Sequence, residues 1–281
     1  MTEPSSAESI IERVCDAVAR VPSVLAVVLG GSRARGWHND RSDIDIGLYY
    51  RGNLDLGALA AVARSLDDAH REDLASGFGD WGPWVNGGAW MTVAGTPVDL
   101  IYRDLDRVDR VIEEVHRGAF EIAYHYGHPL GYVSIFYAGE LAVSQPLHDP
   151  QGLVAARKAR LTPYPEALRR ETIRRFLDEA EFTRAMAKKG AHAGDAAYVA
   201  GAGFRIVACL CHVLFALNRE WLTNEKGAVA RAACFPHRPQ GFADRVETLF
   251  ADLGGDPVAL EASAVSLDQL VDDTRALAAA C

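Results

Sequence analysis

The sequence predicts an α+β protein in which a small mixed β-sheet with helices on one face precedes an all-α helical bundle. Up to residue 104, helical and strand-like runs follow in the order helix, strand, strand, helix, strand, strand. After residue 153 the strand-like runs disappear and apolar residues recur at helical spacing. We therefore expect a mixed-sheet domain over residues 1–150 and a helical domain over residues 151–281. Residues 120–150 either close the first domain or bridge the two.

Each element of the first domain follows from its local pattern. Residues 5–21 carry apolar side chains on one side of a helix, and "VLAVVLG" is a β-branched run that ends in glycine. The next strand is "DIDIGLYY", where acidic and apolar residues alternate, and "LGALAAVARSLDDAH" has helical spacing. The loop "GFGDWGPWVNGG" precedes two strand-like runs around "AGTP", whose Gly and Pro predict a hairpin turn.

Composition excludes several classes of protein. A net charge of −9 opposes binding to a phosphate backbone, so we expect no nucleic-acid partner and no polymerisation onto RNA or DNA. Residues 196–218 are apolar enough to raise the question of a membrane span, but Arg205 and His212 lie within them and favour a buried bundle helix. The N-terminus lacks the pattern of a signal peptide, and five scattered cysteines form no disulfide framework. These features predict a cytoplasmic protein without a membrane partner, and they leave the oligomeric state open.

Two acids share one face of the second predicted strand. Side chains two apart in a strand point the same way, so Asp43 and Asp45 project together while Ile44 and Ile46 face the core. Ionised carboxylates this close call for a cation between them, and Mg²⁺ is usually held by a few carboxylates with phosphates and water. Asp99, in "TPVDLIYRD", is the third acid if its strand lies beside the first. A solvated sheet face is the alternative for an isolated Asp-x-Asp.

A glycine-serine turn comes shortly before these acids. Gly30, Gly31 and Ser32 lie where a strand gives way to a helix, and free backbone N–H groups there form an anion site that glycine lets a phosphate approach. The turn and the acid pair together indicate a nucleoside triphosphate with its magnesium, although the spacing is not that of a P-loop. Arg33 and Arg35 are candidates for a phosphate contact, but a short helix lets at most one of them face the site.

These motifs resemble the signature of the polymerase-β-like nucleotidyltransferase superfamily. The stretches "HDPQG", "YPEAL" and "FALNREWLTNEKGA" further resemble bacterial two-domain members related to aminoglycoside and lincosamide nucleotidyltransferases. The resemblance implies ATP or another NTP as co-substrate and two Mg²⁺ ions bound by Asp43 and Asp45, with Asp99 completing the site of one ion. It also implies that Gly31 and Ser32 hold the β- and γ-phosphates.

The remaining roles have several candidates. In the antibiotic-modifying relatives a Glu near the domain junction is often the general base, which makes Glu140 the candidate here, and a surface acid is the alternative. His125 and His128 are rivals for this role, and Lys226 is a further candidate for a phosphate contact.

Three tryptophans lie in or near the Gly-rich loop. Trp81 and Trp84 are candidates for stacking on a base or ring, with a core position as the alternative for both. Trp90 is assigned to the core.

The resulting prediction is an enzyme that transfers AMP from ATP to a hydroxyl of a small molecule, such as an aminoglycoside- or lincosamide-like antibiotic, and releases pyrophosphate. The acidic composition would suit a cationic acceptor. Two alternatives stay open: a protein AMP-transferase of antitoxin type, which the helical domain disfavours, and a non-catalytic nucleotide-binding protein, which the intact acids disfavour. The sequence identifies neither the acceptor nor the nucleobase.

Overall fold

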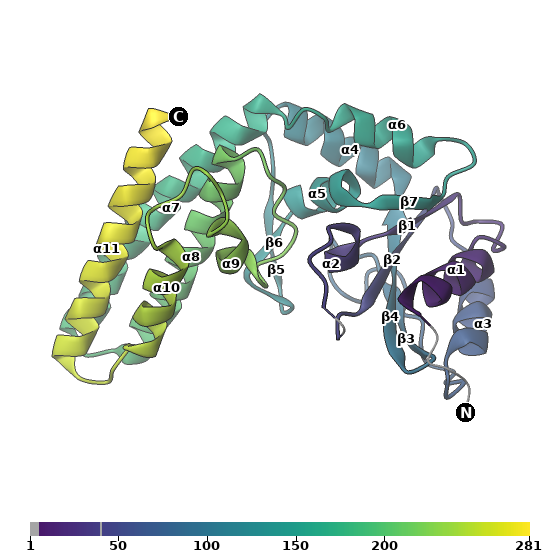
Figure 1. The fold of residues 1–281 in the computed structure, drawn as a ribbon, viewed down its shortest axis with the longest axis horizontal. Coiled ribbons are helices and arrows are strands. Elements are labelled where there is room, and N and C mark those ends of the chain that lie inside the picture. Colours follow the sequence, from purple (N-terminus) through teal and green to yellow (C-terminus); the bar gives the residue numbers. More distant parts are fainter. Residues whose placement is uncertain (1–5, 40) are drawn as a thin grey trace. The chain divides into compact units, whose positions relative to one another are not determined.

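The computed structural model describes residues 6–39 and 41–281, and its chain divides into two compact units (Figure 1). The first unit comprises the chain up to Glu114 with Phe120–His125 and Tyr132–Pro163, and the second comprises Val115–Ala119, Tyr126–Gly131 and Tyr164–Cys281. All residues after Pro163 belong to the second unit, whereas the chain between residues 115 and 131 passes from one unit to the other more than once. The domain boundary at residue 150 stays a prediction.

The first unit is built on a five-stranded mixed sheet with the strand order β3-β4-β2-β1-β7. Its strands are β1 (Ala26–Leu29), β2 (Ile44–Tyr50), β3 (Gly88–Val93), β4 (Thr96–Asp104) and β7 (Gln145–His148). Strands β2 and β4 are parallel, and the other neighbours are antiparallel. The α+β prediction is confirmed, including the hairpin around the "AGTP" turn.

One face of this sheet is covered by helices α1 (Ala7–Val18) and α3 (Leu56–Leu66), which lie along the same side of it in Figure 1. Alternate residues of the central strands, among them Ile44, Ile46 and Leu100, are buried there with the apolar faces of the helices. The period of two therefore leaves Asp45 and Asp99 on the opposite face. Residue 5, where the first helix was predicted to begin, lies outside the described residues.

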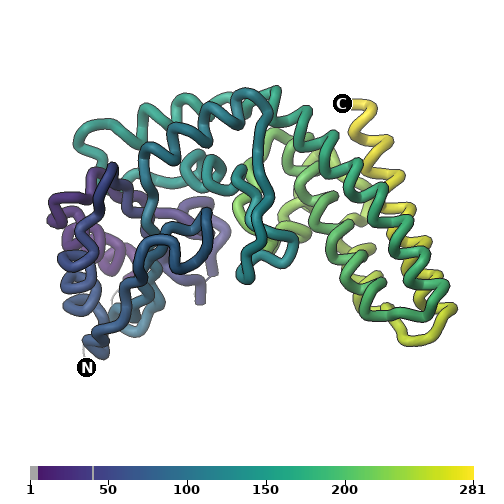
Figure 2. Tube along the Cα trace, turned by 180° about the vertical axis from the view of Figure 1, so that it is seen from behind, coloured from purple at the N-terminus to yellow at the C-terminus, as the bar shows by residue number. Residues whose placement is uncertain are grey.

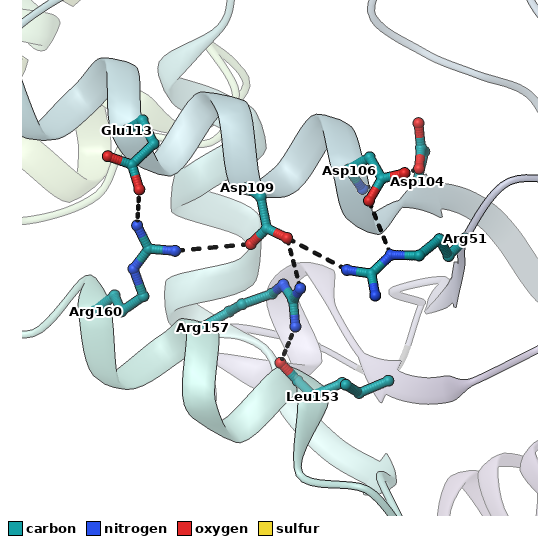
Figure 3. Close-up of polar contacts among 8 residues, drawn as sticks. All are labelled: Arg51, Asp104, Asp106, Asp109, Glu113, Leu153, Arg157 and Arg160. Carbon is teal, nitrogen blue, oxygen red and sulfur yellow. Dashed lines mark hydrogen bonds and ion pairs between the residues drawn. The ribbon is translucent and has the colours of Figure 1, made fainter.

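The other elements before Pro163 are α2 (Gly31–Ala34), α4 (Leu105–His116), β5 (Ile122–His125), β6 (His128–Val133), α5 (Ile135–Val143) and α6 (Leu153–Arg160). All of them belong to the first unit except the last two residues of α4 and the first four of β6, which belong to the second. Strands β5 and β6 form a separate two-stranded sheet. Asp109 of α4 binds Arg157 of α6 at 2.6 Å, and Arg51 and Arg160 approach the same carboxylate at 3.5 and 3.7 Å (Figure 3). This cluster ties α4 to α6 and to the end of β2.

The second unit is helical, as predicted. Its elements are α7 (Glu166–His192), α8 (Ala196–Leu217), α9 (Ala228–Ala232), α10 (Phe242–Ala251) and α11 (Pro257–Ala280). Helices α7, α8 and α11 pack alongside one another, as the trace in Figure 2 also shows. Among the described residues, α8 alone is long and apolar enough to span a membrane, yet 72% of its most apolar window is buried within the protein. It therefore has the character of a core helix.

Candidate active site

Asp45 and Asp99 lie directly opposite each other on the adjacent parallel strands β2 and β4. Neighbouring strands are about 4.8 Å apart, so the two side chains leave the sheet at the same level and on the same face. Asp43 precedes the first residue of β2 by one position, two residues before Asp45. The structure thus brings together the three acids that the sequence singled out.

The electrostatics of the three acids show an excess of negative charge. The pKa of Asp99 is raised to about 6, first because the carboxyl group is partly buried and then because Asp45 and Asp43 are close by. A hydrogen bond from the side chain of Trp90 acts in the opposite direction. A cation among these carboxylates would offset the repulsion.

The donor set is therefore suited to a hard divalent ion. Carboxylate oxygens from Asp43, Asp45 and Asp99 are the ligands that Mg²⁺ uses together with phosphate oxygens and water. Among the residues that the structure describes, no group of three or more His, Cys, Asp or Glu side chains is close enough together to hold a metal ion without further ligands. Such a site suits an ion that arrives with the phosphates of a nucleotide, because the phosphates supply the missing ligands.

The glycine-serine turn is packed directly against Asp45. Helix α2 begins at Gly31, whose φ of +58° lies in the left-handed region that favours glycine. The Gly30 N–H donates a hydrogen bond to the Asp45 carbonyl oxygen at 2.8 Å. A Cβ atom at Gly31 would lie 1.7 Å from Oδ2 of Asp45, so no other residue fits with the carboxylate in its present position. The turn and the acid form one structural site.

Arg33 binds the main chain that leads into the acid pair. Its Nε donates to the carbonyl oxygen of Asp43 at 3.1 Å, and its Nη2 donates to that of Ser42 at 2.7 Å. These bonds connect α2 with the loop before β2 and hold the backbone at Asp43. The guanidinium of Arg35 instead lies over the ring of Trp37, 3.8 Å from its centroid. A phosphate contact of Arg33 stays a prediction, and the structure adds a positioning role.

The assignment of Trp90 to the core is wrong, because its side chain is 44% exposed. Trp90 lies opposite Asp99 in the antiparallel β3–β4 pair and so shares the face of the acids, whereas Ala89 and Met91 point into the core. Trp81, in the preceding loop, packs on it with ring centroids 3.5 Å apart.

Trp84 belongs to a different part of the same loop. Its ring is stacked on Tyr132 with centroids 6.0 Å apart, and the guanidinium of Arg107 lies 5.5 Å above it. These contacts attach the loop to the first unit. Trp84 is therefore a structural anchor here.

Glu140, the candidate base, is bound to a buried arginine. Both Nε, at 3.0 Å, and Nη2 of Arg103 donate to its carboxylate, and the Arg103 side chain is only 6% exposed. Arg103 lies four residues beyond Asp99 on β4, on the same face of the sheet. The ion pair explains why an acid occurs in the apolar helix α5, and the base role stays a prediction.

The rival candidates are placed as follows. His125 packs beside Tyr132, with ring centroids 6.1 Å apart. In the second unit, Nδ1 of His128 lies 2.7 Å from the carboxylate of Glu225, and Lys226 is exposed. None of these contacts involves the three acids.

The comparisons with known proteins agree with this geometry. Residues 8–81 match the family model described as a nucleotidyltransferase domain. The chain carries a nucleotidyltransferase domain. The resemblance to the polymerase-β-like superfamily is thereby confirmed, and a nucleotide is its substrate. The match includes the Gly30–Ser32 turn and the Asp-x-Asp pair and ends before Asp99, whose place in the site comes from the strand register.

Other comparisons say less about chemistry. Residues 140–226 match a domain of unknown function (DUF4037), and no curated protein matches the chain. A nucleotidyltransferase-like protein from Exiguobacterium sibiricum 255-15, known from its crystal structure, is 9% identical with a TM-score of 0.46. That similarity covers 95% of this chain and 75% of the other. A likeness at this level says nothing about activity or acceptor. The relation to aminoglycoside and lincosamide enzymes stays a prediction.

Proposed function

We propose that this protein is a Mg²⁺-dependent nucleotidyltransferase that transfers a nucleoside monophosphate, AMP from ATP in the first instance, to a hydroxyl of a small molecule. An aminoglycoside- or lincosamide-like antibiotic is the acceptor class to test first. The observation that carries the proposal is the in-register pair of Asp45 and Asp99, packed against Gly31 within a nucleotidyltransferase domain.

The residues of the site have separate tasks in this reaction. Asp43, Asp45 and Asp99 would hold two Mg²⁺ ions, and the turn at Gly31 and Ser32 would bind the β- and γ-phosphates through the main chain. When bound, the metal supplies positive charge to the phosphate oxygens and makes the acceptor hydroxyl more acidic. At pH 7 the carboxyl of Asp99 is mostly ionised, because its pKa is about 6, and so it is ready to serve as a ligand.

The bond changes are those of an in-line displacement at the α-phosphorus. The acceptor oxygen forms a bond to this atom, the bond to the bridging oxygen of the β-phosphate breaks, and pyrophosphate leaves with the electron pair. The proton of the acceptor hydroxyl passes to a base, for which Glu140 is the proposed group. If Glu140 serves only as the partner of Arg103, Glu140→Gln will lower the thermal stability without changing the pH profile of kcat.

Radiolabel transfer tests the proposal. The protein is incubated with α-labelled ATP, Mg²⁺ and a panel of hydroxylated aminoglycosides and lincosamides, with cell extract as a second acceptor source. We expect a labelled small molecule and a loss of at least about 100-fold in rate for Asp45→Asn, because the lost charge acts on the transition state. Asp16→Asn is the control, since Asp16 is an exposed acid on α1.

The alternatives predict different products. A labelled protein band would favour a protein AMP-transferase, and nucleotide binding without label transfer to any acceptor would favour a non-catalytic nucleotide-binding protein. Equal transfer by the wild type and by Asp45→Asn would refute the proposed mechanism. Competition by unlabelled CTP, GTP and UTP identifies the preferred base, and a cationic acceptor is expected because the chain carries a net charge of −9.

A further inference from the structure

Trp90 is a large apolar side chain on the acid face of the sheet. It lies on β3, opposite Asp99 of β4, and 44% of its surface is exposed. Its two neighbours in sequence, Ala89 and Met91, are buried on the other face. The register of the hairpin therefore places an indole ring beside the third acid of the site.

The indole lies beside that acid, because Trp90 and Asp99 are directly opposite in the β3–β4 pair. Its N–H acts on the carboxylate of Asp99 as a hydrogen-bond donor and lowers the pKa of that acid. The indole N–H is a donor only, so this bond engages a lone pair of one carboxylate oxygen and leaves the other lone pairs available to a cation. A donor in this position favours one orientation of the Asp99 carboxylate.

The ring of Trp90 is in turn held by the preceding loop. Trp81 packs on it with ring centroids 3.5 Å apart and planes inclined by 40°. Gly88 leaves room for Trp81, because a Cβ there would lie 3.3 Å from the ring and 2.1 Å from the carbonyl oxygen of Leu100. The main chain of Trp90 is fixed as well, since its carbonyl oxygen accepts a bond from Arg71 at 3.3 Å.

Hydrogen bonds within the loop keep Trp81 in place. The Gly77 N–H donates to the carboxylate of Asp80 at 2.7 Å, and the Gly88 N–H donates to Oγ of Ser76 at 3.0 Å. The chain is thus anchored on both sides of Trp81. The loop presents an ordered aromatic pair to the acid.

We propose that Trp90 is a positioning residue for Asp99, which orients this carboxylate toward the divalent ion, and that Trp81 holds Trp90 in the required position. The inference rests on the proposed function, because it assumes that Asp99 binds the metal of the transfer reaction. Outer partners that orient metal ligands typically contribute a factor of about 10 to 100 in metal affinity or activity. The effect should therefore be visible in metal binding itself.

The test measures the affinity for Mn²⁺ without nucleotide, by isothermal titration and by the electron paramagnetic resonance signal of the free ion. Trp90→Phe keeps an aromatic ring but removes the N–H donor, and we expect about tenfold weaker binding. Trp90→His keeps a ring N–H and should recover much of the affinity. Trp84→Phe is the matched control, because Trp84 lies in the same loop but packs on Tyr132.

Three results would overturn the inference. Wild-type affinity in Trp90→Phe shows that the bond does not orient the ligand. An equal loss in both Trp90 variants shows that the bulk of the indole matters and the donor does not, and an equal loss in Trp84→Phe shows a general effect on the loop. If Asp99→Asn binds Mn²⁺ as well as the wild type does, the proposed metal site itself is refuted. A deficient Asp99→Asn beside a normal Trp90→Phe refutes the positioning role alone.

Discussion

Gly31→Ala is expected to inactivate the enzyme by displacing Asp45. The new Cβ would lie 1.7 Å from Oδ2 of Asp45, 2.6 Å from its Cγ and 3.1 Å from its Cβ. Non-bonded contacts to a Cβ do not fall below 3.0 Å, so the carboxylate must move by more than about 1 Å. A misplacement of about 1 Å at a reacting site reduces the rate by about 100-fold.

A second effect of this substitution is conformational and can be separated from the first. An alanine at the φ of +58° found at Gly31 costs about 1–2 kcal/mol, because its Cβ crowds the following carbonyl. Gly36, at the end of the same turn, has a φ of +68°, and no described atom lies within 4 Å of the place of its Cβ. Gly36→Ala therefore carries the conformational cost without the clash.

The assay compares initial rates of label transfer from α-labelled ATP and melting temperatures for the two variants. We expect similar, modest losses of stability in both and a loss of activity in Gly31→Ala alone. If Gly31→Ala retains activity within a few-fold of the wild type, or if Gly36→Ala loses as much, the packing of the turn on Asp45 is not what the reaction depends on.

Three further predictions concern titratable groups. Asp99→Asn should raise the melting temperature of the metal-free protein at pH 7.5 while removing activity, because a folded-state pKa of about 6, above the ordinary 3.8, means that ionisation opposes folding above pH 4. Asp67→Asn should lower the melting temperature at pH 7 by a few degrees. The bonds from Arg71 and Thr92 hold the pKa of Asp67 well below its ordinary value, and this stabilisation is lost only as the pH falls below 4. His212→Phe should reduce the loss of stability between pH 6.5 and pH 5. Burial lowers the pKa of His212 to about 3, so only the unfolded chain gains this proton as the pH falls through 6.5.

The parts of the site that could be predicted from sequence are those set by local periodicity. The alternation of acidic and apolar residues at Asp43–Ile46 places the carboxylates on one face whatever the strand pairs with. Glycine at 30 and 31 indicates a tight turn in the same way. Both features depend on residues within one or two positions, and both are seen in the structure.

The position of Trp90 could also have been found from the sequence. A two-residue turn at Ala94 and Gly95 pairs Val93 with Thr96, and counting outward from this pair places Trp90 opposite Asp99. The assignment of Trp90 to the core rested on its apolar character and did not use this register. The hairpin turn therefore contains enough local information to place Trp90 on the face of the acids.

Other features depend on contacts between distant segments and could not be predicted. The pairing of β2 with β4 is parallel and joins residues far apart in the chain. From the sequence, Asp99 could therefore be placed in the site only on the assumption that the two strands are neighbours. The bond from Arg103 to Glu140 connects β4 with α5, and neither local pattern indicates a partner. The contact between Gly31 and Asp45 could not be predicted either. It shows that glycine is required at position 31 because a Cβ there would clash with the Asp45 carboxylate.

The raised pKa of Asp99 has a consequence for metal removal. In the metal-free protein, burial and the charges of Asp45 and Asp43 oppose the ionised form of Asp99, and the hydrogen bond from Trp90 offsets only part of this effect.

An ion that binds the folded state alone stabilises it by mass action, by about 2.7 kcal/mol at a concentration 100 times its Kd. Mg²⁺ should therefore raise the melting temperature at pH 7.5, and EDTA should reverse the rise. At pH 5 most Asp99 carboxyls are protonated and compete with the ion, so the rise should shrink. An equal rise at both pH values, or an undiminished rise in Asp99→Asn, would show that the ion binds elsewhere.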